Sequence, residues 1–473
     1  MGAPSRAAVF AGLQRYSTPP AWLLAAGDGQ RVGEELARAV PELRSGALAL
    51  CSCVARRIRL KADGWRVEYE VTVGAPGGQR RCLGLVGSLN PPPPEAAEPS
   101  CSIAPLGSPR WRCGLPCLGL ALGTRAEDAE LPAVALLTDA GSARELLERA
   151  IREQATGYES LRIAACAPRI VRYKRGSRCT VIFPLSYHAP RRGWPSLVVA
   201  KTYREEKGRN AYGAMRALWA SPLAAGDVVG IAEPLAYLDQ EHVLIQGPVD
   251  EEVTLKELIR ERLRDGAAAA SGPLVDALHR TGAGLAALHG CGAGYGEPVT
   301  LADELAEVHE RAARLGAALP GVAGAAEPLL TCVSQLASRV PADPLVPSHR
   351  SFRPAQVLLA GDRIAFIDFD GFCQSEPALD VALFRATIKS IGLTMPLDGA
   401  TARRDRLREL DSLCEEFTIA YEASAPVNRD RIALWETLDL LTNVLNCWAK
   451  AKLHRLDGRM LALEAHLQHL VTP

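Results

Sequence analysis

The residues best suited to chemistry lie close together late in the chain. His349, Ser351 and Gln356 fall within one short stretch, and Asp368 and Asp370 follow it soon afterwards. Carboxylate and amide oxygens are the ligands that Mg²⁺ prefers. Histidine takes part in proton transfer, and serine can act in nucleophilic chemistry when a base activates it. The sequence therefore brings together oxygen ligands that suit a metal ion and a histidine that can take part in proton transfer.

Secondary-structure patterns predict how these residues are positioned. Two short strands are expected at 357–359 and 364–367, on either side of Gly361-Asp362, so that Asp368 directly follows a strand. Most of the remaining chain from 251 to 473 has the 3.6-residue periodicity of helices. These helices are predicted at 274–289, 301–315, 325–340, 379–391, 404–421, 432–453 and 460–470.

The middle of the chain, from 156 to 250, is predicted to be rich in strands. Two of them, 170–175 and 179–185, flank a short turn centred on Gly176. A strongly apolar strand at 196–203 carries Lys201 near its end. A helix at 211–219 and a short strand at 243–246 complete this unit.

Residues 1 to 155 are predicted to form a separate unit with antiparallel strands. A three-strand meander is expected from 54–60, 65–73 and 80–85, with Asp63-Gly64 at its first turn. The middle strand alternates, which places every second residue from Trp65 to Val73 on one buried face. Helices are expected at 36–43 and 142–155, the latter with Ser142 as its N-cap. Pro91 to Pro94 predict an extended break.

Composition excludes several classes of protein. The 473 residues carry 54 basic and 54 acidic side chains, so there is no overall positive charge of the kind that a general nucleic-acid binder needs. No apolar run reaches the roughly 18 residues of a membrane span. Met1 to Thr18 lack the apolar region of a secretory signal, so we expect a cytoplasmic protein. The 13 cysteines are expected to be reduced and buried.

Three segments together resemble the aminoglycoside phosphotransferase/choline kinase group. They are the strand Val198–Lys201, the loop His349–Gln356 followed by Asp368, and the segment Glu376–Asp380. The resemblance covers roughly 165–390 and implies an α+β, bilobal, protein-kinase-like fold. The β-rich N-lobe would be 156–250 and the helical C-lobe 251–473, preceded by a small α+β cap or adaptor domain at 1–155.

The resemblance also implies a role for each matching residue. Lys201 would contact the phosphates of ATP or GTP, the hairpin around Gly176 would cover them, and Gln246 would lie in the hinge that holds the base. His349 and Asp380 would brace the loop, and Gln356 and Asp368 would ligate Mg²⁺. Asp370 would add a ligand or bond to the loop. The phosphate-covering hairpin would be residues 172–178, whose basic side chains are Arg172, Lys174, Arg175 and Arg178.

Two departures from the family pattern put phosphoryl transfer in doubt. Ser351 stands where the family has its catalytic aspartate. A serine hydroxyl is not basic near pH 7, and a positioned general base contributes about 10²–10⁴ in rate. In addition, no acid follows Lys201 at the distance of the helix glutamate that normally pairs with it, since Glu205 and Glu206 are too near.

The sequence leaves two main readings open. One is a pseudokinase or impaired kinase that binds Mg-nucleotide. The alternative is an active ATP-dependent small-molecule O-phosphotransferase with an atypical base, for which Asp370 is a candidate. A metal-free structural domain is a third reading, less consistent with Lys201, Gln356 and Asp368 occurring together. The partner is a nucleotide with either a small-molecule acceptor or a protein, and neither nucleic acid nor a membrane is expected.

Overall fold

The computed structural model describes residues 19–75, 78–93, 98–125, 131–204, 206–225, 227–265, 272–319, 321–397 and 399–470. Its residues fall into two compact units. Unit 1 comprises Met1–Glu127, Leu305–Val333 and Leu440–Val471. Unit 2 comprises Asp128–Glu304 and Ser334–Asp439, with the last two residues. The expectations for Met1 to Thr18, Pro94 and Glu205 lie outside the described residues.

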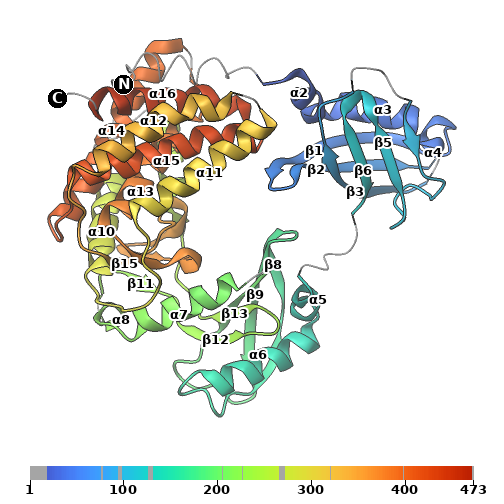
Figure 1. The fold of residues 1–473 in the computed structure, drawn as a ribbon. Coiled ribbons are helices and arrows are strands. Elements are labelled where there is room, and N and C mark those ends of the chain that lie inside the picture. Colours follow the sequence, from blue (N-terminus) through green and yellow to red (C-terminus); the bar gives the residue numbers. More distant parts are fainter. Residues whose placement is uncertain are drawn as a thin grey trace. The chain divides into compact units, whose positions relative to one another are not determined.

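Unit 1 contains a six-stranded antiparallel sheet in the order β1-β2-β3-β6-β5-β4 (Figure 1). The expected three-strand meander is confirmed as β1–β3, and Trp65, Tyr69 and Val73 on its alternating face are buried. The sheet goes on into a segment for which no strand was predicted. The strands are β1 Ala49–Lys61, β2 Gly64–Gly74, β3 Arg80–Leu89, β4 Ser100–Cys101, β5 Arg112–Leu115 and β6 Leu120–Thr124.

The helix expected at 36–43 is confirmed only in part, because residues 36–39 and 41–43 lie in two separate helices, the first of which begins earlier than expected. The chain instead forms α2 Ala21–Gly27, then α3 Gly29–Ala39 and a single turn, α4 Pro41–Arg44. Val40 separates the last two in an extended conformation, with φ −80° and ψ 121°. The residue before a proline is disfavoured from the helical region by a steric clash, and Pro41 is well suited to begin a new helix.

The expectation of reduced, buried cysteines was also wrong in part. Cys101 and Cys113 form a disulfide between β4 and β5, where they are directly opposed in the sheet. Of the other cysteines, Cys51, Cys82 and Cys117 are exposed. Direct cross-strand opposition brings the two Cβ atoms close enough for bonding. The sequence did not predict this pairing because it did not predict β4 and β5.

Unit 2 begins with a strand-rich part whose sheet has the order β12-β13-β10-β9-β7, with β8 paired to β9 (Figure 1). The predicted hairpin, apolar strand and short strand are confirmed. Its strands are β7 Ile163–Cys166, β8 Arg169–Lys174, β9 Arg178–Tyr187, β10 Leu197–Tyr203, β12 Pro234–Leu238 and β13 Val243–Gln246.

Helices flank this sheet, and they begin earlier than predicted. They are α5 Ala133–Thr138, α6 Ala140–Gln154, α7 Lys207–Trp219 and α8 Pro222–Ala225. The N-cap of α6 is Asp139, whose carboxylate accepts a bond from the Ser142 N–H at 2.8 Å, so Ser142 was predicted wrongly as the cap. Leu147 and Ile151 of α6 pack with Phe183 and Val198 of the sheet.

The rest of the chain is mostly helical, as expected. Short strands set the loops of the site: β11 Gly230–Ile231, β14 Val253–Thr254, β15 Val346–Ser348, β16 Val357–Ala360, β17 Arg363–Phe366 and β18 Cys373–Ser375. The helices are α9 Leu255–Asp265, α10 Pro273–His289, α11 Leu301–Ala318, α12 Val322–Ala337, α13 Pro377–Leu393, α14 Gly399–Glu422, α15 Arg429–Ala449 and α16 Leu456–Leu470. The α+β class is therefore confirmed.

An aromatic core fixes the site loops to the helices of unit 2. Phe352 is fully buried and its ring centroid lies 4.8 Å from that of Phe366 and 5.2 Å from that of Phe384. Phe384 in turn lies 4.2 Å from Phe417 of α14. Aromatic pairs at such distances add stability beyond their burial. Among the helices that the structure describes, none is long and apolar enough to cross a membrane.

Candidate functional site

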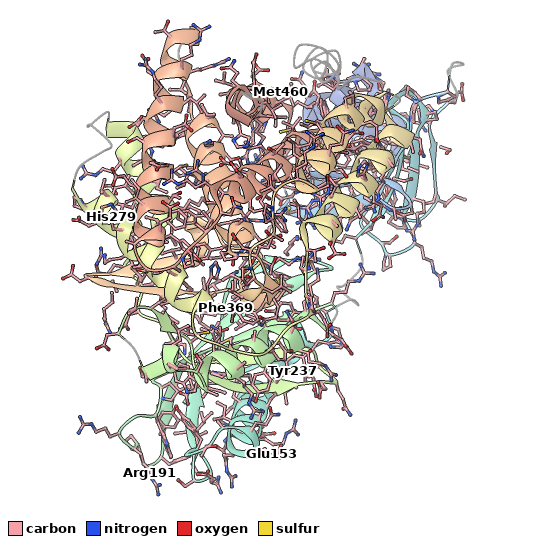
Figure 2. All side chains as sticks on the ribbon, turned by 60° about the vertical axis from the view of Figure 1, so that its left-hand side comes forward. Glu153, Arg191, Tyr237, His279, Phe369 and Met460 are labelled. Carbon is pink, nitrogen blue, oxygen red and sulfur yellow. A yellow bond between two sulfur atoms is a disulfide. The ribbon has the colours of Figure 1, made fainter. Side chains whose placement is uncertain are left out.

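The carboxylates of the site lie on a loop with a strained backbone. Asp368 follows β17 and begins a short 3-10 turn, η3 Phe369–Gly371, with φ 76°. Arg350, on the other loop, also has a left-handed φ of 59°. Such conformations cost about 1–3 kcal/mol in a residue other than glycine and occur often at functional sites. Phe369, labelled in Figure 2, lies between the helices and the strand-rich part that carries Tyr237.

Two cationic side chains, Arg178 and Lys201, contact the carboxylates of Asp368 and Asp370. Arg178 Nη1 is 3.2 and 3.3 Å from the two Asp368 oxygens and 3.2 Å from Asp370 Oδ2. Lys201 Nζ is 3.5 Å from Asp368 Oδ1. The lysine therefore has an acidic partner, which the sequence did not predict. That partner, Asp368, comes from the loop after β17 and not from α7, the helix after Lys201.

Two further side chains hold Asp370 and its loop. The Tyr203 hydroxyl donates to Asp370 Oδ1 at 2.8 Å. Asn210 of α7 donates through Nδ2 to the Asp370 and Phe372 carbonyl oxygens, both at 3.1 Å. The helix after Lys201 thus contacts the loop through an amide rather than a carboxylate.

The sheet explains why these residues meet, and why sequence reasoning missed some of them. Lys201 and Tyr203 are two apart on β10 and therefore share a face. Arg178 lies opposite Tyr203 in the register of β9 and β10, so it joins that face. Strand alternation could have identified Tyr203. Arg178 belongs to the basic hairpin that the sequence predicted, but its contact with the two carboxylates required the strand register. Asn210 required an earlier start for α7.

The surroundings shift the pKa values of the two carboxyl groups in opposite directions. Burial by itself raises the pKa of Asp368, but the charges of Lys201 and Arg178 outweigh burial and lower the pKa to about 2. For Asp370, burial and the neighbouring Asp368 carboxylate raise the pKa despite the same two cations. The positive charges of Arg178 and Lys201 thus keep the Asp368 carboxyl group ionised at neutral pH.

Ser351 forms a hydrogen-bonded pair with the histidine of its own loop. His349 Nε2 lies 3.0 Å from the Ile367 carbonyl oxygen, which can only accept, so the ring proton is on Nε2. His349 Nδ1 is then an acceptor, and the Ser351 Oγ lies 3.1 Å from it. The serine hydroxyl thus has two acceptors within reach, His349 Nδ1 and, at 3.4 Å, the Asp368 carbonyl oxygen. No carboxylate stands at this position.

Asp380 supports the same loop from the first turn of α13. Its Oδ2 accepts a bond from the His349 backbone N–H at 2.6 Å and lies 3.3 Å from His289 Nε2. The ring of His289 reaches the Tyr421 hydroxyl at 2.8 Å through Nδ1. Because Asp380 and His349 are fully buried, this chain of bonds fixes the loop from within.

Mg²⁺ would require the carboxylate oxygens that Arg178 now contacts. An ion between Asp368 and Asp370 would lie beside a guanidinium, which is unfavourable without other charges. The Gln356 amide bonds to Asp368, while Gln356 Oε1 is buried and accepts no bond from any described residue. That oxygen alone suits a cation. While Arg178 contacts the two carboxylates, the side chains of Gln356, Asp368 and Asp370 do not fit Mg²⁺.

The remaining predicted residues lie on two other elements. Arg172 is exposed on β8, and Lys174 ends that strand before the turn, where Gly176 has a φ of 60°. Gln246 is buried at the end of β13. The next two positions offer a base no free N–H donor, because the Gly247 N–H bonds to the Glu233 carbonyl at 2.8 Å and Pro248 has none.

Comparison with known proteins gives a family match for the segment that carries the site. Residues 199–415 match the family described as "Phosphotransferase enzyme family". No curated protein matches the chain significantly. The resemblance on which the site residues were chosen is thus confirmed over that segment.

Solved structures of several small-molecule kinases are similar at low identity. A glucosamine kinase in complex with glucosamine, ADP and inorganic phosphate is 17% identical over 70% of this chain and 85% of its own, with a TM-score of 0.49. A choline/ethanolamine kinase family protein from Mesorhizobium loti is 16% identical over 64% and 89%, with a TM-score of 0.43. A fructosamine-3-kinase from Thermobifida fusca, described as putative, is 19% identical over 69% and 99%, with a TM-score of 0.44.

Proposed function

Because residues 199–415 match the phosphotransferase enzyme family, we propose that the chain is a kinase-like nucleotide-binding protein impaired in phosphoryl transfer. Lys201 and Arg178 would contact the phosphates of ATP or GTP from the same face of the sheet. Arg172 and Lys174 of the β8–β9 hairpin would add positive charge beside them. Gln246 would mark the segment that meets the base.

The position of Arg178 is the observation that carries this proposal. Its guanidinium contacts both carboxylates that family members would use for a metal ion. Ser351 cannot replace a carboxylate base, since a serine hydroxyl is not basic near neutral pH. The site therefore lacks the usual base, and its acidic groups are already neutralised by the chain's own cations. Such a site suits binding better than turnover.

Nucleotide binding would then not depend on Mg²⁺. The assignment of Gln356, Asp368 and Asp370 as Mg²⁺ ligands stays a prediction that requires Arg178 to leave the two carboxylates. We derive no chemical step through the metal. The domain limits 1–155, 156–250 and 251–473 also stay predictions, with the first segment proposed as an adaptor for a protein partner or as a cap.

One observation favours the alternative, an active O-phosphotransferase with an atypical base. Ser351 and His349 can relay a proton. The acceptor hydroxyl would pass its proton to Ser351 Oγ while the Ser351 proton moves to His349 Nδ1, leaving the serine neutral and the histidine protonated. Asp370 is a poorer base than we expected from the sequence, because Tyr203 and Arg178 occupy its two oxygens.

The test is nucleotide binding and turnover measured on the same full-length protein. We expect calorimetry to detect ATP or GTP binding, and a coupled assay with a panel of alcohols and amino sugars to detect no turnover above the uncatalysed rate. Rapid turnover by the native chain would overturn the impaired reading. Absence of binding to either nucleotide would overturn both readings.

Ser351→Asp and Ser351→Ala form the matched pair for this assay. Under the impaired reading, Ser351→Ala binds nucleotide as the native chain does and remains inactive. Ser351→Asp gains activity only if the absence of a carboxylate base at this position is what prevents turnover. Under the alternative, the native chain is active and Ser351→Ala loses about 10²–10⁴ in rate, because the relay is broken.

A further inference from the structure

Cationic side chains gather where α15 ends and α16 begins. Lys450 and Lys452 follow α15, Arg455 ends the 3-10 turn η4 Leu453–Arg455, and Arg459 lies in the first turns of α16. Ala451 takes a left-handed φ of 49°, and the Lys452 N–H bonds back to the Cys447 carbonyl at 2.8 Å. This tight turn places the four cations on one short connection. Met460, labelled in Figure 2, marks the place.

These four side chains, which we call the α15–α16 basic cluster, make no ion pair with any described residue. Buried cations elsewhere are paired, for example Lys389 with Glu436 at 2.8 Å. Asp457 is the acidic residue nearest in sequence. It is exposed, and within the described residues it forms no ion pair with any of the four side chains. The cluster is therefore a local excess of positive charge, without ion pairs to described residues, in a protein of zero net charge.

The environment makes the positive charge of the cluster unfavourable. Burial and, to a smaller extent, the charges of Arg59, Arg311, Lys452 and Arg459 together lower the pKa of Lys450 to about 8. Arg59 lies on β1 and Arg311 on α11, both within unit 1. Like charges at a half-buried position repel each other strongly. An anion would relieve this repulsion.

Arg459 also has an unused donor. Its Nη1 donates to the Asn443 carbonyl at 2.7 Å and lies 3.2 Å from Asn443 Oδ1, which fixes the guanidinium. Its Nε is buried and bonds to no described residue. A buried donor without an acceptor is costly, so an anion that approached this guanidinium would gain a charge-assisted hydrogen bond.

Helix-end electrostatics explain only half of the cluster. Lys450 and Lys452 follow the C-terminus of α15, where cations are favourable. Arg455 and Arg459 instead lie at the N-terminus of α16, where the helix dipole disfavours cations and favours anions. Their position therefore has no explanation in helix stability.

We propose that the α15–α16 basic cluster binds a compact polyanion that carries several phosphate groups. Several cations in one place call for more than one negative charge. Most of the cluster is half-buried rather than presented on an open surface, which suits a small ligand better than a membrane or a duplex. All the residues belong to unit 1, whereas Lys201 and Asp368 belong to unit 2, so this inference does not depend on the proposed nucleotide site.

The test uses inorganic tripolyphosphate as the probe in calorimetry at low salt. We expect binding that weakens as salt is added and that persists in Lys201→Ala, which excludes the nucleotide site as its location. The double variant Lys450→Gln/Arg459→Gln should weaken binding about tenfold or more. A matched control, Arg38→Gln/Arg314→Gln, removes two exposed unit 1 arginines that are already ion-paired and should bind as the native chain does.

Thermal unfolding separates binding from a structural role. Without ligand, Lys450→Gln should raise the melting temperature, because it removes repulsion, and it should reduce the stabilisation by tripolyphosphate. Equal tripolyphosphate affinity in the native chain and the double variant would overturn the proposal, as would the absence of binding at low salt. Binding of single-stranded RNA or phosphatidylserine vesicles, without binding of tripolyphosphate, would also overturn it in favour of a macromolecular partner.

Discussion

At the scale of single residues, Arg178 decides how the site differs from a metal-binding kinase site. Its Nη1 contacts Asp368 and Asp370 from the strand opposite Tyr203. The same two carboxylates in a metal-dependent site would face a divalent cation. One guanidinium therefore supplies charge that a bound ion would supply. It does so without the open coordination positions that an ion offers to phosphate oxygens.

Lys450 gives a prediction about pH at the same scale. With a pKa lowered to about 8 by burial and then by the neighbouring cations, about half of its amine is neutral at pH 8, against less than about 1% for an ordinary lysine. We expect acetic anhydride to label Lys450 with a midpoint near pH 8, measured by peptide mass spectrometry across a pH series. Labelling that rises only near pH 10 would contradict this.

The sign of the stability effect follows from the same shift. The folded pKa of Lys450 lies below its unfolded value, so the unfolded chain binds more protons between about pH 8 and the ordinary lysine range. The contribution of this residue to stability should therefore rise as pH increases through that window. Lys450→Gln should remove this part of the pH dependence.

At the scale of elements, the buried pair of Glu376 and Arg431 joins the start of α13 to α15. Arg431 Nε donates to Glu376 Oε2 at 2.5 Å, and the two side chains are 5% and 3% exposed. Glu376→Gln leaves a buried guanidinium without its counter-charge. We expect a loss of about 3–5 kcal/mol in the free energy of unfolding, measured in urea.

The control for this pair is an exposed one. Arg314→Gln breaks the surface pair with Glu310 and should change stability by less than about 1 kcal/mol. A similar loss in both variants would show that burial does not set the energy of the Glu376–Arg431 pair.

Gly282 gives a second prediction for elements, at the contact of α10 with α14. An added Cβ would lie 2.6 Å from the Phe417 carbonyl oxygen and 2.9 Å from the Tyr421 nitrogen. Since both atoms are backbone, the helices must separate. Gly282→Ala should therefore destabilise unit 2 by about 1–3 kcal/mol. Gly294→Ala, with open space around it, should not lower the melting temperature measurably.

The sequence predicted long, periodic elements well and predicted contacts between elements poorly. The helix from Pro273 to His289 was predicted almost as it stands, because periodicity depends on neighbouring residues. The contact of Arg178 with Asp368 depends on strand register and on a left-handed aspartate. Neither property is local to the residues that meet.

At the scale of the whole molecule, the disulfide predicts how many free thiols the chain carries. The chain has 13 cysteines, of which 11 are free and two form the Cys101–Cys113 bond. Alkylation of the denatured, unreduced protein should therefore label 11 thiols, and alkylation after reduction should label 13. Labelling of all 13 without reductant would contradict the bond. Mass spectrometry of the intact chain distinguishes the outcomes.

The whole chain also shows where sequence reasoning ends. The family resemblance identified Lys201, His349, Gln356, Asp368 and Asp380, and the structure brings all of them to one loop system in unit 2. The α15–α16 basic cluster was not predicted although its four residues lie within ten positions, because the sequence does not show that most of them are half-buried or that Arg59 and Arg311 lie near Lys450.

The most direct test of the central claim is ATP affinity measured by calorimetry with excess Mg²⁺ and with EDTA, in the native chain and in Arg178→Gln. If Arg178 and Lys201 neutralise the carboxylates, the native affinity should change by less than about threefold with Mg²⁺. Arg178→Gln should bind at least about tenfold more tightly with Mg²⁺ than without it, because Asp368 and Asp370 then accept the ion. A native chain that binds ATP only when Mg²⁺ is present would contradict the account.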